Sequence, residues 1–115
     1  MDSSLETTLG SLTLKRPTVL ASGILGISLD VFKRLHDAGA GAVVTKSLSK
    51  EPWEGYPNPT IFSVKGGGWI NAVGLSNPGA ETFAKMIEPN NDVPIIVSLV
   101  GSEEDDFEYM INKFE

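Results

Sequence analysis

Cysteine is absent from the 115 residues of this chain, and histidine occurs only once. These residues therefore contain no disulfide, no thiolate metal site and no cysteine nucleophile. Positive charge is also scarce, because nine Lys and Arg are set against fifteen Asp and Glu, which gives a formal net charge of -6. Nucleic acid and anionic membranes repel a negative chain, so we expect neither as a partner.

Long hydrophobic runs are missing as well, since no apolar run approaches the roughly 20 residues of a membrane-spanning helix. The amino terminus has no basic segment followed by an apolar one, as a secretory signal would. Repeats, low-complexity tracts and linkers are not found. The lack of a membrane span and of a secretory signal leads us to expect a soluble, cytoplasmic protein. We expect one domain over residues 1–115, because a 41% hydrophobic content is ordinary for a globular chain.

The first third of the chain predicts a leading hairpin and then a βα unit. Residues 5–8 and 11–14 are short strand-like segments around a Leu-Gly turn. Residues 18–21 form a continuous apolar run, which is typical of a parallel strand buried on both faces. Ser28 suits the N-cap of a helix whose apolar spacing continues to Gly39, a natural C′ residue.

The middle of the chain predicts a second parallel strand and a long excursion from it. The strand covers residues 42–46, and the excursion runs from 48 to 68 with several prolines and a Gly-Gly-Gly tip. A short hairpin is expected between residues 61–64 and 69–71. Long ordered loops in compact domains are usually functional, and this one leads back to the strand ends.

The last third predicts a helix, a buried strand and a second helix. Residues 78–87 have helical spacing with Asn77 as the expected N-cap, and residues 95–100 are the strongest buried-strand signal in the chain. Ser102 and Asp105 match the opening of a helix that runs through Phe114. Four consecutive acids in its first turn suit the helix dipole, so we favour a solvated helix start and expect no metal site.

Three βα units with short apolar strands predict an α/β fold with a parallel sheet. A (β/α)₈ TIM barrel and an open doubly wound sheet both remain, and a whole barrel needs roughly 250 residues. Gly39 and Gly41 do not form a dinucleotide fingerprint, because they follow a helix and precede a strand. Ser22, Lys46 and Asn71 lie at or beyond the carboxyl ends of predicted strands, where barrel active sites are built.

The most informative stretch is residues 69–79, which read WINAVGLSNPG. Asn71 and Asn77 each offer one carbonyl acceptor and two N–H donors, which suits a planar ligand with amide and carboxylate edges. Gly74 removes a side chain where such a ligand could lie against the backbone. The alternative is an ordinary turn, since Asn, Gly and Pro are the commonest turn residues.

Three motifs together resemble one family. The asparagine stretch 71–79, the Ala-Ser-Gly of 21–23 and the Thr-Lys-Ser of 45–47 are similar to segments of the class 1 dihydroorotate dehydrogenases of pyrimidine biosynthesis. The similarity covers residues 12–115. The residues of the asparagine stretch are more similar to those of the NAD-linked class 1B enzymes than to those of the fumarate-linked type. It implies the amino-terminal portion of a flavin-binding (β/α)₈ barrel, with further units outside this chain.

The resemblance also implies a chemistry and a set of residues. The family oxidises (S)-dihydroorotate to orotate in UMP biosynthesis, passing a hydride to FMN while a base removes a proton. It implies no catalytic base within this chain, since the base is expected beyond Glu115. The residues expected to contact the cofactor are Ala21, Ser22, Gly23, Lys46 and Ser47. Those expected to contact the substrate are Lys46, Asn71, Ala72, Val73, Gly74 and Leu75.

The resemblance implies that Lys46 offsets negative charge near the flavin, whereas the residue considered by itself favours an ordinary surface lysine at a strand end. The resemblance implies an iron–sulfur and FAD electron-transfer subunit as partner and an oligomer. It further implies that the 115 residues alone are inactive. Two alternatives remain: a flavin domain like that of dihydropyrimidine dehydrogenase, and a non-catalytic half-barrel that binds a ligand.

Overall fold

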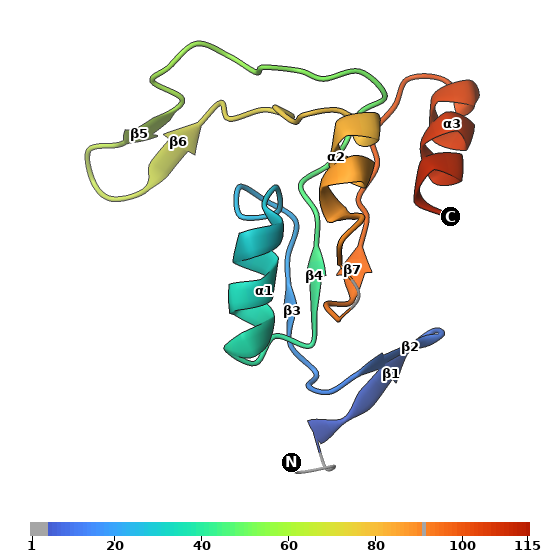
Figure 1. The fold of residues 1–115 in the computed structure, drawn as a ribbon. Coiled ribbons are helices and arrows are strands. Elements are labelled where there is room, and N and C mark those ends of the chain that lie inside the picture. Colours follow the sequence, from blue (N-terminus) through green and yellow to red (C-terminus); the bar gives the residue numbers. More distant parts are fainter. Residues whose placement is uncertain (1–4, 91) are drawn as a thin grey trace.

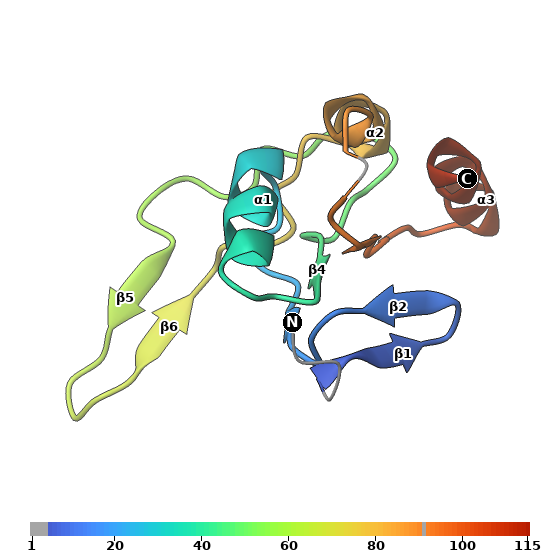
Figure 2. The same ribbon diagram turned by 60° about the horizontal axis from the view of Figure 1, so that its bottom comes forward.

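The computed structural model describes residues 5–90 and 92–115, which form a small parallel sheet, three helices and two antiparallel hairpins (Figure 1). The leading hairpin pairs β1 (Thr7–Leu9) with β2 (Leu12–Leu14) and confirms the predicted one. It lies beyond the amino ends of the sheet strands, away from the edge where their carboxyl ends meet (Figures 1 and 2).

The sheet has the order β3–β4–β7, and both of its strand pairs are parallel. Its strands are β3 (Val19–Leu20), β4 (Ala42–Val44) and β7 (Ile95–Ile96). The helices are α1 (Leu29–Asp37), α2 (Ala80–Ile87) and α3 (Glu104–Phe114). Each sheet strand is followed by one helix, although a long excursion separates β4 from α2. The structure thus confirms the predicted βα units and the α/β class.

The strands are shorter than the predicted segments 18–21, 42–46 and 95–100. The reason is that β4 leaves the regular ladder at its carboxyl end. The Lys46 N–H donates to the Gly26 carbonyl (2.8 Å) instead of to a strand neighbour. Parallel pairing resumes only as an isolated bridge between Leu48 and Leu99.

The core lies between the sheet and the helices α1 and α2. Phe32 of α1 and Phe83 of α2 are fully buried, and their rings lie 6.3 Å apart between centroids. Together with Val43 of β4 they join one cluster of buried side chains. Burial on both faces is confirmed for β4 alone. It is wrong for β3 and β7, which are half-buried or exposed because they are the outer strands of this sheet.

Two of the predicted helix starts are wrong. The N-cap of α2 is Gly79, with φ of 85°, and not Asn77, whose side-chain oxygen accepts the Gly79 N–H (2.9 Å) one residue upstream of the helix. The N-cap of α3 is Glu103, so Ser102 and Asp105 do not form a capping box. Ser28 is the N-cap of α1 as predicted, although its side chain makes no capping hydrogen bond.

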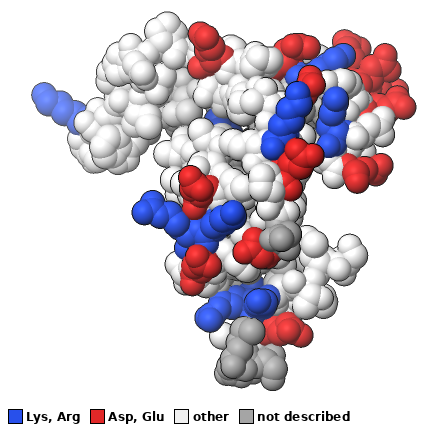
Figure 3. All heavy atoms as spheres, viewed as in Figure 1, with Lys and Arg blue, Asp and Glu red and all other residues white. Residues whose placement is uncertain are grey.

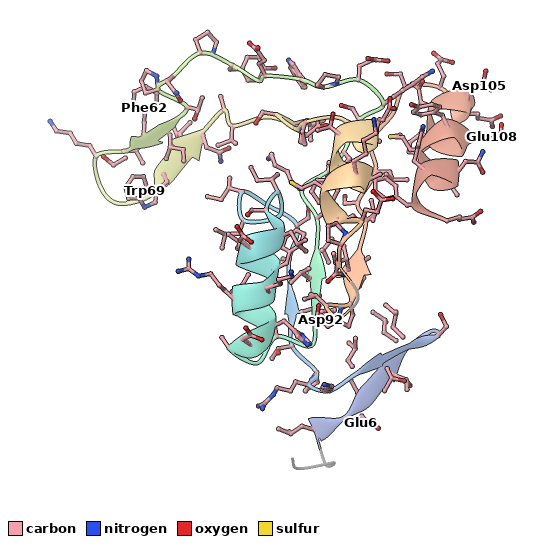
Figure 4. The ribbon with its side chains drawn as sticks, in the orientation of Figure 1. Glu6, Phe62, Trp69, Asp92, Asp105 and Glu108 are labelled. Atoms are coloured by element: carbon pink, nitrogen blue, oxygen red, sulfur yellow. The ribbon has the colours of Figure 1, made fainter. Side chains whose placement is uncertain are left out.

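The excursion between β4 and α2 ends in a projecting hairpin, which we call the arm. It pairs β5 (Ile61–Ser63) with β6 (Trp69–Asn71) in antiparallel register, as predicted, and the three glycines form its tip. The arm extends away from the sheet and helices (Figures 1 and 2), and Phe62 and Trp69 lie on it (Figure 4). Every residue of the two strands is exposed, Trp69 to 75%.

Acidic side chains gather over α3 at the upper right of Figure 3. Glu104, Asp105 and Asp106 occupy its first turn, where they lie near the positive end of the helix dipole. In the described part of the chain, no group of three or more potential metal ligands comes together. None of the helices in those residues is long and apolar enough to cross a membrane.

The packed ring pair provides a stability prediction. Replacing Phe83 by Ala leaves a cavity beside Phe32, and large-to-small changes of this kind cost about 3–5 kcal/mol. Denaturant unfolding should show that loss for Phe83→Ala. Phe62→Ala on the exposed arm is the control and should change stability by less than about 0.5 kcal/mol. An equal loss of unfolding free energy in the two variants would contradict a core that contains Phe83 and excludes Phe62.

Candidate functional site

The carboxyl ends of the three parallel strands meet around Thr45, which is fully buried. The Ser22 hydroxyl, after β3, donates to the Thr45 carbonyl (2.7 Å). The Ser98 N–H, after β7, donates to the Thr45 hydroxyl (3.0 Å), and the Ser47 and Ser98 hydroxyls lie 3.0 Å apart. The structure therefore brings together the predicted residues Ser22, Lys46 and Ser47 at one edge of the sheet.

Lys46 is only 8% exposed, so the surface-lysine alternative is wrong. Its ammonium Nζ donates to the Gly74 carbonyl at 3.3 Å, across a separation of 28 residues. The ion pairs found among the described residues join Lys50 to Asp106 and Lys85 to Glu81, and neither involves Lys46. A buried ammonium without a carboxylate partner is costly in isolation and favours an anionic ligand.

Gly26 was missed by the sequence reasoning and lies directly against Lys46. Its carbonyl accepts the Lys46 N–H, and a Cβ built on Gly26 would lie 2.2 Å from that nitrogen. Only glycine allows the β3–α1 loop to approach the end of β4 so closely. No signal in the sequence points to this role. A side chain is excluded at Gly26 by a contact with a residue twenty positions later in the chain, which local patterns do not show.

The predicted substrate residues 71–75 form the loop that leaves the arm. Asn71 is exposed, and its side-chain oxygen accepts the Val73 N–H at 3.4 Å, a local bond of the kind that the turn alternative expects. Gly74 has φ of 67°, and a Cβ there would lie 3.0 Å from the Tyr56 ring. Of these residues, Gly74 reaches Lys46, whereas the Asn71 side chain bonds within its own loop.

Asn77 does not have the capping role that the sequence predicts for it. The residue is only 8% exposed, and its side chain bonds to Ser49, Leu75 and Gly79. Ser98 does have a signal in the sequence, because it is the lone hydroxyl inside the apolar run 95–100. A cleft of about 370 Å³ opens beside Asn77 and is bordered by Ile27 and Trp53.

Ala21 and Gly23 flank Ser22 in the loop after β3. A Cβ built on Gly23 would meet no atom within 4 Å, so there is open space beside this backbone. Ala21 is exposed and Gly23 is half-buried. Flat ligands are bound by backbone of this kind, where a glycine permits close approach.

A sequence profile of the family described as dihydroorotate dehydrogenase matches residues 4–115. Curated relatives named dihydroorotate dehydrogenase B (NAD⁺), catalytic subunit, include that of Pyrococcus horikoshii, which is 43% identical over 112 residues, 96% of this chain and 37% of the relative. The relative of the same name from Archaeoglobus fulgidus is 44% identical over 115 residues, again 96% of this chain and 37% of its own length.

Among solved structures, the crystal structure of DHODH in complex with ferulenol from Eimeria tenella matches with a TM-score of 0.74. At 19% sequence identity, this match concerns the fold alone. It covers 98% of this chain and 34% of the other. The chain thus spans little more than a third of the proteins that it matches.

The contact between Gly26 and Lys46 provides a second prediction. Gly26→Ala places a methyl group against backbone, so we expect a loss of about 1–3 kcal/mol, the usual cost of overpacking. Gly23→Ala in the same loop is the matched control, since its new methyl group meets open space. Thermal unfolding of both variants measures the difference. A Gly26→Ala protein as stable as Gly23→Ala would mean that the loop does not touch Lys46.

Proposed function

The chain belongs to the dihydroorotate dehydrogenase family, and from that premise we propose that it supplies the amino-terminal part of a flavin-dependent enzyme that oxidises dihydroorotate to orotate. The proposed setting is a (β/α)₈ barrel whose first βα units are the ones described above. The parallel order β3–β4–β7 and the match in fold support that architecture.

The observation that carries the proposal is the buried ammonium of Lys46 at the strand ends, bonded to the Gly74 carbonyl of the asparagine loop. Dihydroorotate and orotate carry a carboxylate and a ring of amide groups, and their oxidation delivers negative charge to the acceptor. A preorganised cation in a site with little water stabilises such charge far more than it would in solution. In this proposal, the Lys46 ammonium would lie where substrate and acceptor meet.

We propose FMN as the flavin. Bound FMN would supply the acceptor for the hydride removed from dihydroorotate. The residues present fit a flat, polar ring system. The backbone at Gly23 borders open space, and the Ser22 hydroxyl donates to the Thr45 carbonyl and has oxygen lone pairs that can accept a bond. Ala21 would contribute backbone, and Ser47 would contribute a hydroxyl from the end of β4.

The substrate would be held by the loop of residues 71–75 together with Lys46. The Asn71 side chain bonds locally through its oxygen, so its N–H groups are the donors that it can offer to a ligand. Ala72, Val73 and Leu75 would contribute backbone groups, and Gly74 would give room for close approach. A base from a later part of the barrel would remove the substrate proton.

The relatives' names call them the catalytic subunit of an NAD⁺-linked enzyme. We extend this to the present chain as a proposal: electrons leave through a partner subunit that carries an iron–sulfur cluster and FAD. The oligomeric state and the cytoplasmic location stay predictions from composition and resemblance.

The proposed role of Lys46 is tested by its removal in the complete protein. Lys46→Ala should slow dihydroorotate-dependent flavin reduction by roughly two to three powers of ten, the scale for losing one preorganised electrostatic group. Stopped-flow absorbance of the flavin measures the rate. Lys85→Ala is the control, because Lys85 lies on α2 with a side chain exposed to 74%. An unchanged rate for Lys46→Ala would refute the assignment.

The Asn71 side chain has two candidate roles, a contact with the ligand and a bond within the local turn. One variant distinguishes between them. If the ligand bonds to its amide, Asn71→Ala costs about 1–3 kcal/mol of binding, or roughly ten- to a hundredfold in orotate affinity. Flavin-monitored titration and thermal melting measure affinity and stability. Asn112→Ala, at an exposed position of α3, serves as control. Early melting with normal orotate affinity would leave Asn71 as a turn residue only.

A further inference from the structure

The Asn77 side chain uses both ends of its amide. Its oxygen accepts the backbone N–H groups of Gly79 (2.9 Å) and Ser49 (3.1 Å). Its nitrogen donates to the Leu75 carbonyl (2.6 Å) and to the Ser49 hydroxyl (2.9 Å). A buried amide with its acceptor and both donors engaged is held in one orientation, because any rotation leaves polar groups unpaired.

These bonds join two segments that are distant in sequence. Ser49 lies three residues after Lys46, on the segment that leaves β4, and Leu75 directly follows Gly74 in the asparagine loop. The backbone strengthens the connection, since Trp53 and Asn77 exchange two N–H to carbonyl bonds of 3.0 and 2.8 Å. The loop is therefore attached to the segment that follows Lys46 through both side chain and backbone.

The bond from Lys46 to Gly74 spans the same two segments and closes a ring of contacts. The backbone leads from Lys46 to Ser49, and a hydrogen bond joins Ser49 to Asn77. A second hydrogen bond joins Asn77 to Leu75, which is the neighbour of Gly74 in the chain. The Gly74 carbonyl then accepts the hydrogen bond from Lys46 and completes the ring. The Tyr56 ring packs against Gly74 from the excursion. In such a ring, the Asn77 amide sets the distance between the Gly74 carbonyl and the ammonium.

We propose that Asn77 is a positioning residue for the site. It touches neither substrate nor cofactor, and acts by holding the Gly74–Leu75 backbone against the Lys46 ammonium at the separation that a planar, carboxylate-bearing ring requires. The proposal rests on the proposed function for the identity of the ligand. The ring of contacts that it describes stands independently of that identity.

Asn90 is a matched control within the same chain. Its nitrogen donates to the Val93 carbonyl (2.8 Å), and its oxygen accepts the Val93 N–H (3.2 Å), so it also closes a loop with both ends of its amide. It lies in the connection from α2 to the amino end of β7, whereas Lys46 follows the carboxyl end of β4. Because β4 and β7 are parallel, the two residues lie at opposite ends of the strands. Removing its side chain should affect folding but not the site.

The experiment compares Asn77→Ala with Asn90→Ala in the complete protein. Three quantities are measured: thermal stability, hydrogen–deuterium exchange of peptides spanning residues 71–77, and orotate affinity from the flavin spectrum. Both variants should melt earlier. Only Asn77→Ala should exchange faster in residues 71–77 and bind orotate more weakly, by roughly tenfold or more, as expected when buried polar groups lose their partner.

Ser49→Ala is a milder variant for the case in which Asn77→Ala does not fold. It removes the hydroxyl contact to Asn77 and keeps the bond from the Ser49 N–H, so we expect orotate affinity to fall roughly threefold, an effect below that of a full hydrogen bond. Normal affinity and normal exchange in both Asn77→Ala and Ser49→Ala would overturn the proposal. The proposal would also be overturned if Asn90→Ala weakened orotate binding as much as Asn77→Ala does. The loss of affinity would then be a result of general destabilisation.

Failure of the proposed function would look different. In that case the unmodified protein would not bind orotate, while Asn77→Ala would still exchange faster than Asn90→Ala across residues 71–77. That result would retain Asn77 as the residue that holds the Gly74 loop against Lys46 and discard the pyrimidine as its ligand.

Discussion

The arrangement of this chain depends on the parallel pairing of β4 with both of its neighbours, which continues into the backbone and hydroxyl of Thr45. The Thr45 N–H donates to Ile96, its carbonyl accepts from Ser22, and its hydroxyl accepts from Ser98. One buried residue therefore fixes the carboxyl ends of all three strands relative to each other. Lys46 is the next residue, so the position of its ammonium follows from the same contacts.

Burying an ammonium at this edge requires compensation, because a charge removed from water is costly without polar partners. The Gly74 carbonyl, which the long excursion brings back to the strand ends, accepts a hydrogen bond from the ammonium. The backbone of the same residue is satisfied separately, because the Gly26 carbonyl accepts the Lys46 N–H. The excursion thus positions the loop at the strand ends, while the arm at its far end carries exposed apolar side chains.

Local patterns predicted the elements well and their ends less well. The hairpins, helices and parallel strands follow from apolar spacing and turn residues, which act over a few positions. The strands came out shorter because Lys46 bonds to Gly26, a contact that periodicity cannot reveal. Asn77 was expected to cap α2 from its place before Pro78, yet its amide bonds to Ser49, 28 residues earlier in the chain. The motif around Lys46 drew attention to that residue, whereas no pattern in the sequence distinguished Gly26.

The sequence by itself determined the order of elements, the α/β class, the acidic character and the motifs of the dihydroorotate dehydrogenase family, since each of these is written in residue types and short spacings. The tertiary structure decided that Lys46 is buried against Gly74, that Gly26 must lack a side chain, and that Asn77 links the loop to the end of β4. The physical reason is that these contacts join segments about 20–30 residues apart, and such contacts depend on the path of the intervening chain and not on its local propensities.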